Sequence, residues 1–508
     1  MSSKLLLGID VGTGGTRAVL IDDAGAVVAS CTAEHAAFAS PETGWAEQDP
    51  RDWWRATCEA VKQVMATSAT NPTEIAAVGF SGQMHGAVLL DAAGEVLRPA
   101  LIWCDQRTSE EARELTAEVG EDQIIAWTCN PAITNFTLTK LLWVRKHEPA
   151  VFEHFRTLLL PKDYVRYRLT GEYGMDMADA SGTLLLDVSK RRWSTEMAHA
   201  TGVDPTCLPP LFESPDVCAT VSETGAAATG LLPGTPVVAG AGDQAAGAVG
   251  LGIVSPGAVH ATIGTSGVVF AATDRPALDP KGRLHTFCHA IPGRWHVMGV
   301  TQSAGLSLRW FRDNFGTRAN DSRDPYEQLS DEAAAVPPGC DGVLWTPYLM
   351  GERTPHLDPH ARAALIGLAA NHGRGHVIRA ILEGVAFSLR DSFSIFAEMK
   401  VPVTSIRLGG GGARSPLWRQ IQADVFGHAV ELVQAEEGAA YGAALLAGVG
   451  AKVWSDVDEA CQRSVRVAKT VEPIPATSAL MNQQYELYRR IYPALRDIRR
   501  NSNSSAVA

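Results

Sequence analysis

The chain has 508 residues, and at about 150 residues per domain this length predicts two or three domains. It carries 44 Lys and Arg against 56 Asp and Glu, a net charge of −12, which excludes a protein that binds nucleic acid through a basic surface. With 46% hydrophobic and 20% charged residues, the composition is that of a folded protein with a large core rather than a disordered one.

The nine cysteines include no C-x-x-C pair, which argues against a disulfide framework or a zinc module and fits a reducing compartment. The N-terminal apolar stretch is too short for a signal peptide. The longest apolar tract, 237–261, is interrupted by Asp243, Gln244 and His260, so it is too polar for a membrane span. We therefore expect a cytoplasmic protein that binds neither nucleic acid nor membrane.

Strands and a turn rich in glycine and threonine open the chain. The strands are expected at 5–10 and 17–22, on either side of a turn at 11–16, with a third strand at 27–30. Asp49 and Pro50 then supply the N-cap and the first position of a helix, and a strand at 75–80 follows it. Strands, a helix and another strand indicate a mixed α/β domain.

The strand–turn–strand arrangement recurs about half a chain later. Residues 259–270 again place a small turn, Gly264-Thr265-Ser266-Gly267, between two apolar stretches. This repeat suggests two related domains that face each other, with two unrelated hairpins as the alternative.

Further on, apolar residues at helical spacing predict a long helix over 371–399, and a strand follows at 405–408. A second helix is expected to begin with Ser415 as N-cap and to end at Gly427. The four glycines at 409–412 lie between this strand and this helix, and they would let a flat group approach the backbone.

Two of the glycine-rich turns, at 12–16 and 264–267, have the chemistry of phosphate sites. Such turns present backbone N–H groups and hydroxyls to an anion. Neither is a Walker loop, and no Gly-x-Gly-x-x-Gly pattern follows the first strand. The alternative is that the glycines only relieve strain in tight turns.

Two aspartates are candidates for the chemistry. Asp10 ends the first strand, where its carboxylate could hold Mg²⁺ or cap its own turn. Asp243 lies among small apolar residues, where an unpaired carboxylate is costly. It could take the proton of an alcohol during phosphoryl transfer, or serve as the N-cap of the alanine-rich helix that follows.

Met84 and His85 follow a strand end among glycines, where a histidine could hydrogen-bond a sugar hydroxyl or simply pack. Trp103, Asp105 and Arg107 could line a sugar pocket. The alternative is that Trp103 belongs to the core and Asp105 pairs with Arg107.

These residues lie in motifs that run along nearly the whole chain. One family signature fits at 363–383, and another fits at 135–147 except for its atypical opening residue, Asn135. On these motifs the chain resembles the FGGY carbohydrate kinases and, within them, the bacterial xylulokinases. The other matching segments are Gly8-Ile9-Asp10-Val11-Gly12-Thr13, Glu47-Gln48-Asp49-Pro50-Arg51-Asp52-Trp53-Trp54, Ser81-Gly82-Gln83-Met84-His85-Gly86, Leu160-Pro161-Lys162-Asp163-Tyr164, Gly351-Glu352-Arg353-Thr354-Pro355-His356 and Gly410-Gly411-Gly412-Ala413-Arg414-Ser415.

The resemblance implies an α/β fold of two actin-like (ribonuclease-H-like) domains with the catalytic cleft between them. Residues 1–243 would bind the sugar and carry the first phosphate loop, and residues 244–508 would bind ATP. The implied reaction is phosphorylation of D-xylulose at its 5-hydroxyl, with ATP and Mg²⁺. A homodimer is compatible with the sequence, which does not fix the oligomeric state.

The resemblance also implies roles for single residues. Asp243 resembles the catalytic base and Asp10 the Mg²⁺-associated acid. Gln244 stands where the family pattern has Asn, which leaves the ketose preference open. The sugar contacts would be Met84, His85, Trp103, Asp105 and Gln244, and the contacts to ATP would be Gly12, Thr13, Gly14, Thr16, Gly264, Thr265, Ser266, Gly410, Gly411, Gly412 and Ala413.

Three alternatives remain. The same chemistry could act on ribulose, glycerol or gluconate, although the Gln83-Met84-His85 run argues against glycerol. A sugar sensor without transferase activity would not need both Asp10 and Asp243. A chaperone-type ATPase would need a peptide-binding region, and none is visible after Gly450.

Overall fold

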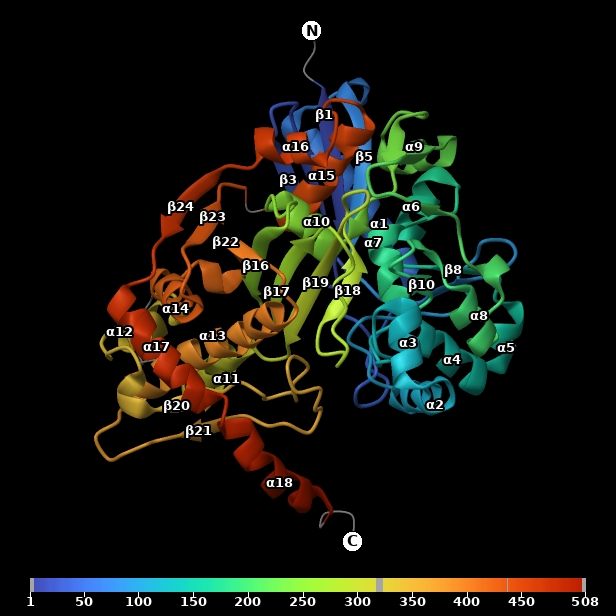
Figure 1. Cartoon of the computed structure of the whole chain (residues 1–508). Helices are drawn as coiled ribbons and strands as arrows, with labels where there is room; N and C mark the ends of the chain where they lie inside the picture. Colours follow the sequence, from blue (N-terminus) through green and yellow to red (C-terminus); the bar gives the residue numbers. More distant parts are fainter. Residues whose placement is uncertain (1–3, 317–322, 436, 505–508) are drawn as a thin grey trace.

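Two mixed sheets of seven strands each organise the computed structural model, which describes residues 4–316, 323–435 and 437–504 (Figure 1). The first sheet has the order β13-β14-β5-β1-β2-β3, with β15 paired to β5. Its strands are β1 (Leu5–Val11), β2 (Gly15–Ile21), β3 (Val27–Glu34), β5 (Ile75–Gly82), β13 (Val217–Thr220), β14 (Pro236–Val238) and β15 (Ala241–Gly242).

The second sheet belongs to the second half of the chain and has the order β18-β19-β17-β16-β22-β23-β24. Its strands are β16 (Gly257–Ile263), β17 (Gly267–Thr273), β18 (His285–Cys288), β19 (Trp295–Thr301), β22 (Val403–Gly409), β23 (Val430–Val433) and β24 (Val467–Val471).

The two sheets share one topology. In the first, β1 pairs antiparallel with β2, β2 pairs antiparallel with β3, and β5 runs parallel to β1. In the second, β16, β17 and β19 form the same antiparallel series, and β22 runs parallel to β16. The hairpins predicted around 11–16 and 264–267 therefore open two halves of one topology, and the expectation of two related domains is confirmed.

Helices and five two-stranded sheets cover these layers. The predicted N-caps are confirmed, because Asp49 accepts from the N–H of Arg51 and Ser415 from that of Trp418. The helices are α1 (Pro50–Ser68), α2 (Ser109–Val119), α3 (Glu121–Thr128), α4 (Thr137–His147), α5 (Pro149–His154), α6 (Pro161–Thr170), α7 (Met177–Ala180), α8 (Thr195–Thr201), α9 (Glu223–Thr229), α10 (Asp243–Gly250), α11 (Gly305–Phe315), α12 (Pro325–Ala334), α13 (Arg374–Glu398), α14 (Pro416–Phe426), α15 (Gly438–Gly450), α16 (Val457–Ser464), α17 (Pro475–Tyr488) and α18 (Ile491–Ser504). The small sheets pair β4 (Glu47–Gln48) with β7 (Ala100–Leu101), β6 (Val88–Leu90) with β8 (Thr157–Leu159), β9 (Met175–Asp176) with β12 (Leu211–Phe212), β10 (Leu186–Asp187) with β11 (Arg192–Trp193) and β20 (Leu344–Thr346) with β21 (Ala364–Ile366).

The long helix α13 begins at Arg374, three residues later than the apolar spacing predicts. The Nδ1 atoms of His372 and His376 accept the N–H groups of Ala369 and Gly373, at 3.0 and 3.1 Å. These bonds hold the preceding residues in a turn that ends at the helix start. In the part of the chain that the structure describes, no helix has the length and hydropathy to cross a membrane.

Helix α15 comes from the second half of the sequence but lies on the first sheet, with α16 near it (Figure 1). Glycines in the strands make this close approach possible: a Cβ on Gly8 would lie 2.0 Å from the carbonyl oxygen of Ala440, and one on Gly79 would lie 2.0 Å from that of Ala443. A division of the chain at 243/244 therefore separates the two sheets but not the helices that pack on them, and this boundary stays a prediction.

Candidate active site

The ends of three parallel strands bring the predicted acidic residues to one edge of the first sheet. In β1 and β5, Asp10 pairs with Ser81, and in β5 and β15, Ser81 pairs with Ala241. The carboxyl ends of parallel strands are where ligands bind in α/β sheets. Asp243 follows at this edge as the first residue of α10, with Gly242 at the N-cap position, so it is not the helix N-cap.

Burial and a neighbouring charge raise the pKa of Asp243 to about 7, since removal from water disfavours the carboxylate and Asp10 adds a like charge. The N–H and side chain of Gln244 offset part of this effect. Burial also raises the pKa of Asp10, against the opposing influence of Ser81 and Arg17. A carboxyl that titrates near neutral pH can accept a proton from an alcohol in the transition state.

Asp10 also has the chemistry of a Mg²⁺ ligand. Its Oδ1 atom is buried and has no hydrogen-bond partner among the described residues. A hard divalent cation takes carboxylate oxygens as ligands. An unpartnered buried carboxylate oxygen at the sheet edge therefore fits the cation that the sequence predicts.

The two predicted phosphate turns leave matching N–H groups unpaired. In the first turn, the N–H of Gly12 bonds to the carbonyl of Gly15 at 3.0 Å, while those of Thr13 and Gly14 donate to no acceptor in the described chain. In the second, the N–H of Gly264 bonds to the carbonyl of Ser266 at 2.9 Å, and the next two N–H groups are unpaired among the described residues. Successive free N–H groups form an anion-binding concavity.

The third turn lies against the second. A Cβ on Gly410, which has φ of 73°, would lie 2.5 Å from the carbonyl oxygen of Ile263, and one on Gly412 would lie 2.5 Å from the Cβ of Ile263. The turn that includes Gly411 and Ala413 thus packs directly against Ile263, the last residue of β16, which precedes Gly264. The structure thus brings together the two turns, at 264–267 and 410–413, that the sequence predicts to bind the nucleotide.

Thr16 is placed differently from its predicted neighbours. Its side chain is fully buried, and its hydroxyl lies 2.9 Å from Nε2 of His35. The first turn is instead tied to its surroundings by Gln48, whose Nε2 donates to the carbonyl of Thr13 at 2.8 Å. The side chain of Thr16 therefore packs in the interior of the hairpin, and its hydroxyl is not exposed with the polar groups of the turn.

Met84 lies beside Gly242, the residue before Asp243, and His85 follows Met84 in the chain. A Cβ on Gly242 would come within 2.8 Å of the Cγ of Met84. Nδ1 of His85 lies 2.9 Å from the carbonyl oxygen of Gly182, so this nitrogen carries the proton and Nε2 is left as an acceptor. Burial, with smaller effects of Lys140 and Arg353, lowers the pKa of His85 to about 3, which keeps the ring neutral.

Trp103 and Asp105 differ in their surroundings. Trp103 is 39% exposed, and its Nε1 donates to the hydroxyl of Thr13 at 2.9 Å. Asp105 is fully buried, binds Arg107 at 2.7 Å and accepts the N–H of Ala46 at 2.6 Å. The pairing of Asp105 with Arg107 is the alternative that the sequence left open, and this carboxylate is occupied by protein donors.

A buried charge cluster next to Gly242 was not predicted. The ammonium of Lys162 lies 2.6 Å from Asp163, 2.5 Å from Asp176 and 3.3 Å from Asp179, and all four side chains are fully buried. Burial, together with the charges of Asp176 and Asp163, raises the pKa of Asp179 well above its ordinary value despite the nearby lysine. The adjacent Lys-Asp pair in the Pro161–Tyr164 motif was the available sequence cue.

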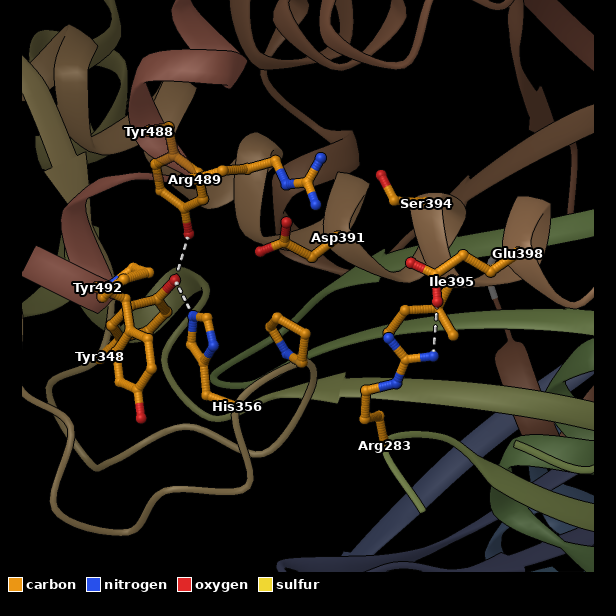
Figure 2. A pocket seen from close by; sticks show the side chains of 12 residues that line it. Arg283, Tyr348, His356, Asp391, Ser394, Ile395, Glu398, Tyr488, Arg489 and Tyr492 are labelled. Carbon is orange, nitrogen blue, oxygen red and sulfur yellow. Dashed lines mark hydrogen bonds and ion pairs between the residues drawn. The ribbon is translucent and has the colours of Figure 1, made fainter. Parts of the chain in front are cut away.

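A cavity of about 210 Å³ lies elsewhere, in the second half of the chain (Figure 2). Its polar groups bind one another: the hydroxyl of Tyr348 lies 2.8 Å from that of Tyr488 and 3.1 Å from Nε2 of His356. Neither Asp10 nor Asp243 lines it. We therefore do not assign it to the reaction.

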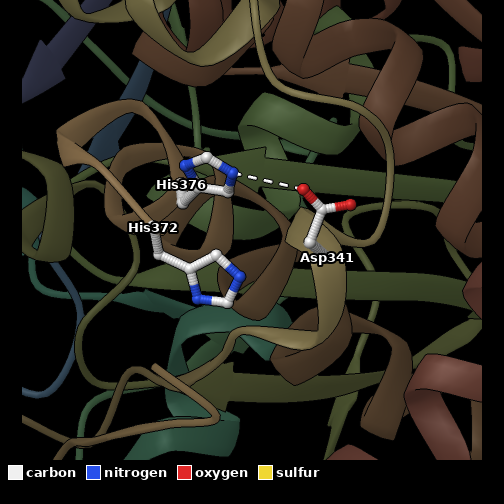
Figure 3. Close-up of side chains that lie close together, drawn as sticks. All are labelled: Asp341, His372 and His376. Atoms are coloured by element: carbon white, nitrogen blue, oxygen red, sulfur yellow. Dashed lines mark hydrogen bonds and ion pairs between the residues drawn. The ribbon is translucent and has the colours of Figure 1, made fainter. Parts of the chain in front are cut away.

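Asp341, His372 and His376 form the one group of three potential metal ligands found among the described residues (Figure 3). As noted above, both histidines accept backbone N–H groups at Nδ1, which puts their protons on Nε2. Nε2 of His376 then donates to Asp341 at 3.3 Å instead of offering a lone pair. This group holds the start of α13 and is not assigned to a metal.

Known proteins resemble the chain over nearly its full length. A xylulose kinase from Bacillus subtilis (strain 168) is 39% identical, over 97% of this chain and 98% of the relative. A gluconokinase from the same organism is 32% identical over 87% of each chain. The crystal structure of a xylulose kinase from Rhodospirillum rubrum has a TM-score of 0.90 and 31% identity, and covers 98% of this chain and 100% of that one.

The two halves also match the two domains of one family. Residues 5–250 match the N-terminal domain of the FGGY family of carbohydrate kinases, and residues 259–451 match its C-terminal domain. These matches confirm the predicted two-domain α/β fold and the predicted ATP-dependent sugar kinase chemistry. The chain belongs to the FGGY family of carbohydrate kinases.

Proposed function

We propose that this kinase transfers the γ-phosphoryl group of ATP to the 5-hydroxyl of D-xylulose. The observation that carries the proposal is Asp243, a carboxyl with a near-neutral pKa that lies close to Asp10 at the sheet edge and follows Gly242, which Met84 contacts. The choice of D-xylulose is supported by the xylulose kinases that match nearly the whole chain.

Both polar and apolar side chains hold the sugar. The neutral ring of His85 offers Nε2 as an acceptor for a sugar hydroxyl, and Met84 supplies an apolar surface. Trp103 is partly exposed next to Thr13 and can cover the sugar where it meets the first turn. Gln244, directly after Asp243, can reach a hydroxyl near the one that reacts.

The phosphates are held by backbone groups. The unpaired N–H groups of the two turns, at Thr13-Gly14 and at Thr265-Ser266, donate to phosphate oxygens from two sides. The turn of residues 410–413 accommodates the adenosine. When bound at Asp10, Mg²⁺ neutralises part of the phosphate charge. In this proposal residues 1–243 hold the sugar and carry the first phosphate turn, and residues 244–508 hold the rest of ATP.

Transfer needs no covalent enzyme intermediate. The sugar hydroxyl oxygen forms a bond to the γ-phosphorus while the bond to the ADP oxygen breaks, and Asp243 takes the hydroxyl proton. The products are D-xylulose 5-phosphate, ADP and that proton. Most of the rate enhancement then comes from positioning and from stabilisation of charge.

Coupled ADP release tests the proposal. Purified protein with MgATP is assayed on D-xylulose, D- and L-ribulose, glycerol and gluconate. Release that requires D-xylulose and falls about 10²- to 10⁴-fold in Asp243→Ala is expected. Asp204→Ala, which changes an exposed aspartate of the same half, should retain full activity. Equal activity of Asp243→Ala and the unaltered protein would refute the assigned base.

Gluconate is the second candidate substrate, because the chain is also similar to a gluconokinase. Release that is strongest with gluconate would keep the kinase chemistry and move the substrate assignment. Sugar binding without any ADP release would instead favour a sensor.

A further inference from the structure

The Gly351–Pro355 loop of the second half presents an arginine to the first half. Glu352 anchors this loop, since its carboxyl accepts the hydroxyl of Thr301 at 2.5 Å and the N–H groups of Gln302 and Arg353 at 3.0 and 2.7 Å. The backbone of Arg353 is therefore fixed. The motif was recognised in the sequence, but no role was given to this residue.

The side chain of Arg353 reaches across to Asn135, the residue that is atypical in the family signature. One terminal nitrogen of Arg353 donates to Oδ1 of Asn135 at 2.8 Å. Nδ2 of Asn135 donates to the carbonyl of Trp103 at 2.7 Å. The carbonyls of Asn135 and His85 each accept from the ammonium of Lys140 at 2.8 Å. Arg353 thus joins the group of residues that carries the proposed sugar contacts.

Most of the hydrogen-bonding capacity of this arginine is unused. Within the described residues its guanidinium makes the one bond to Asn135 and forms no ion pair with a carboxylate. A guanidinium has five N–H donors in a planar fork. The charge of Arg353 also acts on His85 and on His285, and the rings of these two histidines both lie against Phe136, with centroids 5.2 and 5.5 Å away.

We propose that Arg353 is a sugar-binding residue that the second half contributes to the site. Its free N–H groups donate to adjacent oxygen atoms of the ketose held at His85, and Asn135 sets the orientation of the fork. This inference rests on the proposed function. It adds to Gln244 a second sugar contact from the half of the chain assigned to ATP, more than one hundred residues further along the sequence.

Direct calorimetric titration tests the contact without the need for turnover. D-xylulose and, separately, a non-hydrolysable ATP analogue are titrated into the unaltered protein, Arg353→Met, Arg353→Lys and Asn135→Ala. Arg353→Met should weaken sugar binding about 10- to 100-fold, since hydrogen bonds from a charged donor are lost. Arg353→Lys should recover only part, because an ammonium lacks the fork. Asn135→Ala should weaken sugar binding less than Arg353→Met, and analogue binding should change less than twofold in all three.

Arg390→Met is the matched control. Arg390, in α13, also donates to an asparagine, Asn482 of α17, at 2.6 Å, in the same half of the chain. This variant should bind sugar and analogue like the unaltered protein. Thermal unfolding of each variant establishes that it is folded.

Three results would overturn the inference: unchanged sugar affinity in Arg353→Met, an equal loss of analogue affinity, or the same loss in Arg390→Met. Failure of the proposed function looks different. If the unaltered protein binds D-xylulose but releases no ADP, the phosphotransferase assignment fails, and a loss of binding in Arg353→Met still supports the contact. If the unaltered protein binds no sugar of the panel, both fail.

Discussion

The carboxyl of Asp243 illustrates how position gives a residue its chemistry. Aspartate ordinarily titrates near pH 4, and burial at the start of α10 together with the charge of Asp10 raises the pKa to about 7. The same residue type at Asp105 is held as a carboxylate partner of Arg107. The difference lies in the neighbours, which come from other strands and loops.

The pH dependence of the reaction follows from this pKa. A general base works in its deprotonated form, so kcat/KM for the sugar should fall towards tenfold per pH unit below pH of about 7 and level off above it. Steady-state rates from pH 5.5 to 8.5 at constant free Mg²⁺ measure the profile. A flat profile down to pH 5.5, with the coupling enzymes shown to be in excess, would contradict a base of this pKa.

Substitution of two members of the Lys162 cluster should affect the stability of the protein to very different extents. Burial and the neighbouring aspartates raise the pKa of Asp179 well above its usual range and so favour its neutral form, and Asp179→Asn should change the free energy of unfolding by less than about 1 kcal/mol. Lys162→Met leaves buried carboxylates without their cation and should cost about 3 to 5 kcal/mol.

Urea unfolding at pH 7 compares these two variants. Equal destabilisation by both would show that Asp179 is ionised in the folded protein. Asp163→Asn, which removes a carboxylate that binds both Lys162 and Arg166, serves as a third point on the same cluster.

The sequence predicted Asp10 and the glycine turns because each follows a recognisable strand, and it predicted Asp243 because an unpaired carboxylate among small apolar residues is costly. It did not separate Thr16 from its neighbours, since strand alternation turns this side chain into the hairpin interior. Nor did it indicate that Lys162 meets Asp176 and Asp179, which depends on where α6 packs.

At the scale of elements, α10 and α15 form the contact on which the position of Asp243 depends. Gly442 of α15 is so close to α10 that a Cβ on it would lie 1.8 Å from the carbonyl oxygen of Ala246. In the sequence, α15 is a run of small and apolar residues. This pattern does not indicate the sheet on which the helix packs. Helices from one half that cover the other half leave no local pattern in the sequence.

Substitution of two glycines tests this contact. Gly442→Ala should push the helices apart, lower the free energy of unfolding by about 1 to 3 kcal/mol and reduce kcat, because Asp243 begins α10. Gly247→Ala is the matched control on α10: its Cβ would meet nothing within 4 Å, so it should stabilise the helix by about 0.5 to 1 kcal/mol. Similar stability of the two variants would contradict the packing.

At the scale of the whole molecule, one topology used twice places a turn with unpaired N–H groups after the first strand of each sheet. The short repeat of Gly and Thr in the sequence predicted this duplication, because both turns follow the first strand of their sheets. The contacts that join the halves, such as Arg353 with Asn135, are separated by more than two hundred residues in the sequence and could be found only in three dimensions.

The free energy of unfolding of the whole protein should depend on pH through a buried carboxyl outside the active site. Burial raises the pKa of Asp391, in α13, to about 7, while its ordinary value is 3.8. Between these values the folded state holds a proton that the unfolded state has lost, so the free energy of unfolding falls as pH rises from about 4 to 7 and is constant above. At one pKa unit per 1.36 kcal/mol, this carboxyl costs up to about 4 kcal/mol at pH 8.

Asp391→Asn removes this cost, and its amide oxygen can still accept the hydroxyl of Tyr485, which lies 2.7 Å from Asp391. In urea unfolding, the free energy of unfolding of the variant minus that of the unaltered protein should be about 2 to 3 kcal/mol larger at pH 8 than at pH 5. Asp279→Asn is the control of opposite sign: hydrogen bonds from Arg283 outweigh burial and lower the pKa of Asp279, so its loss should destabilise equally at both pH values. A constant difference between Asp391→Asn and the unaltered protein across this range would mean that Asp391 is ionised in the folded state throughout, and that Arg390 and Arg489 compensate its burial.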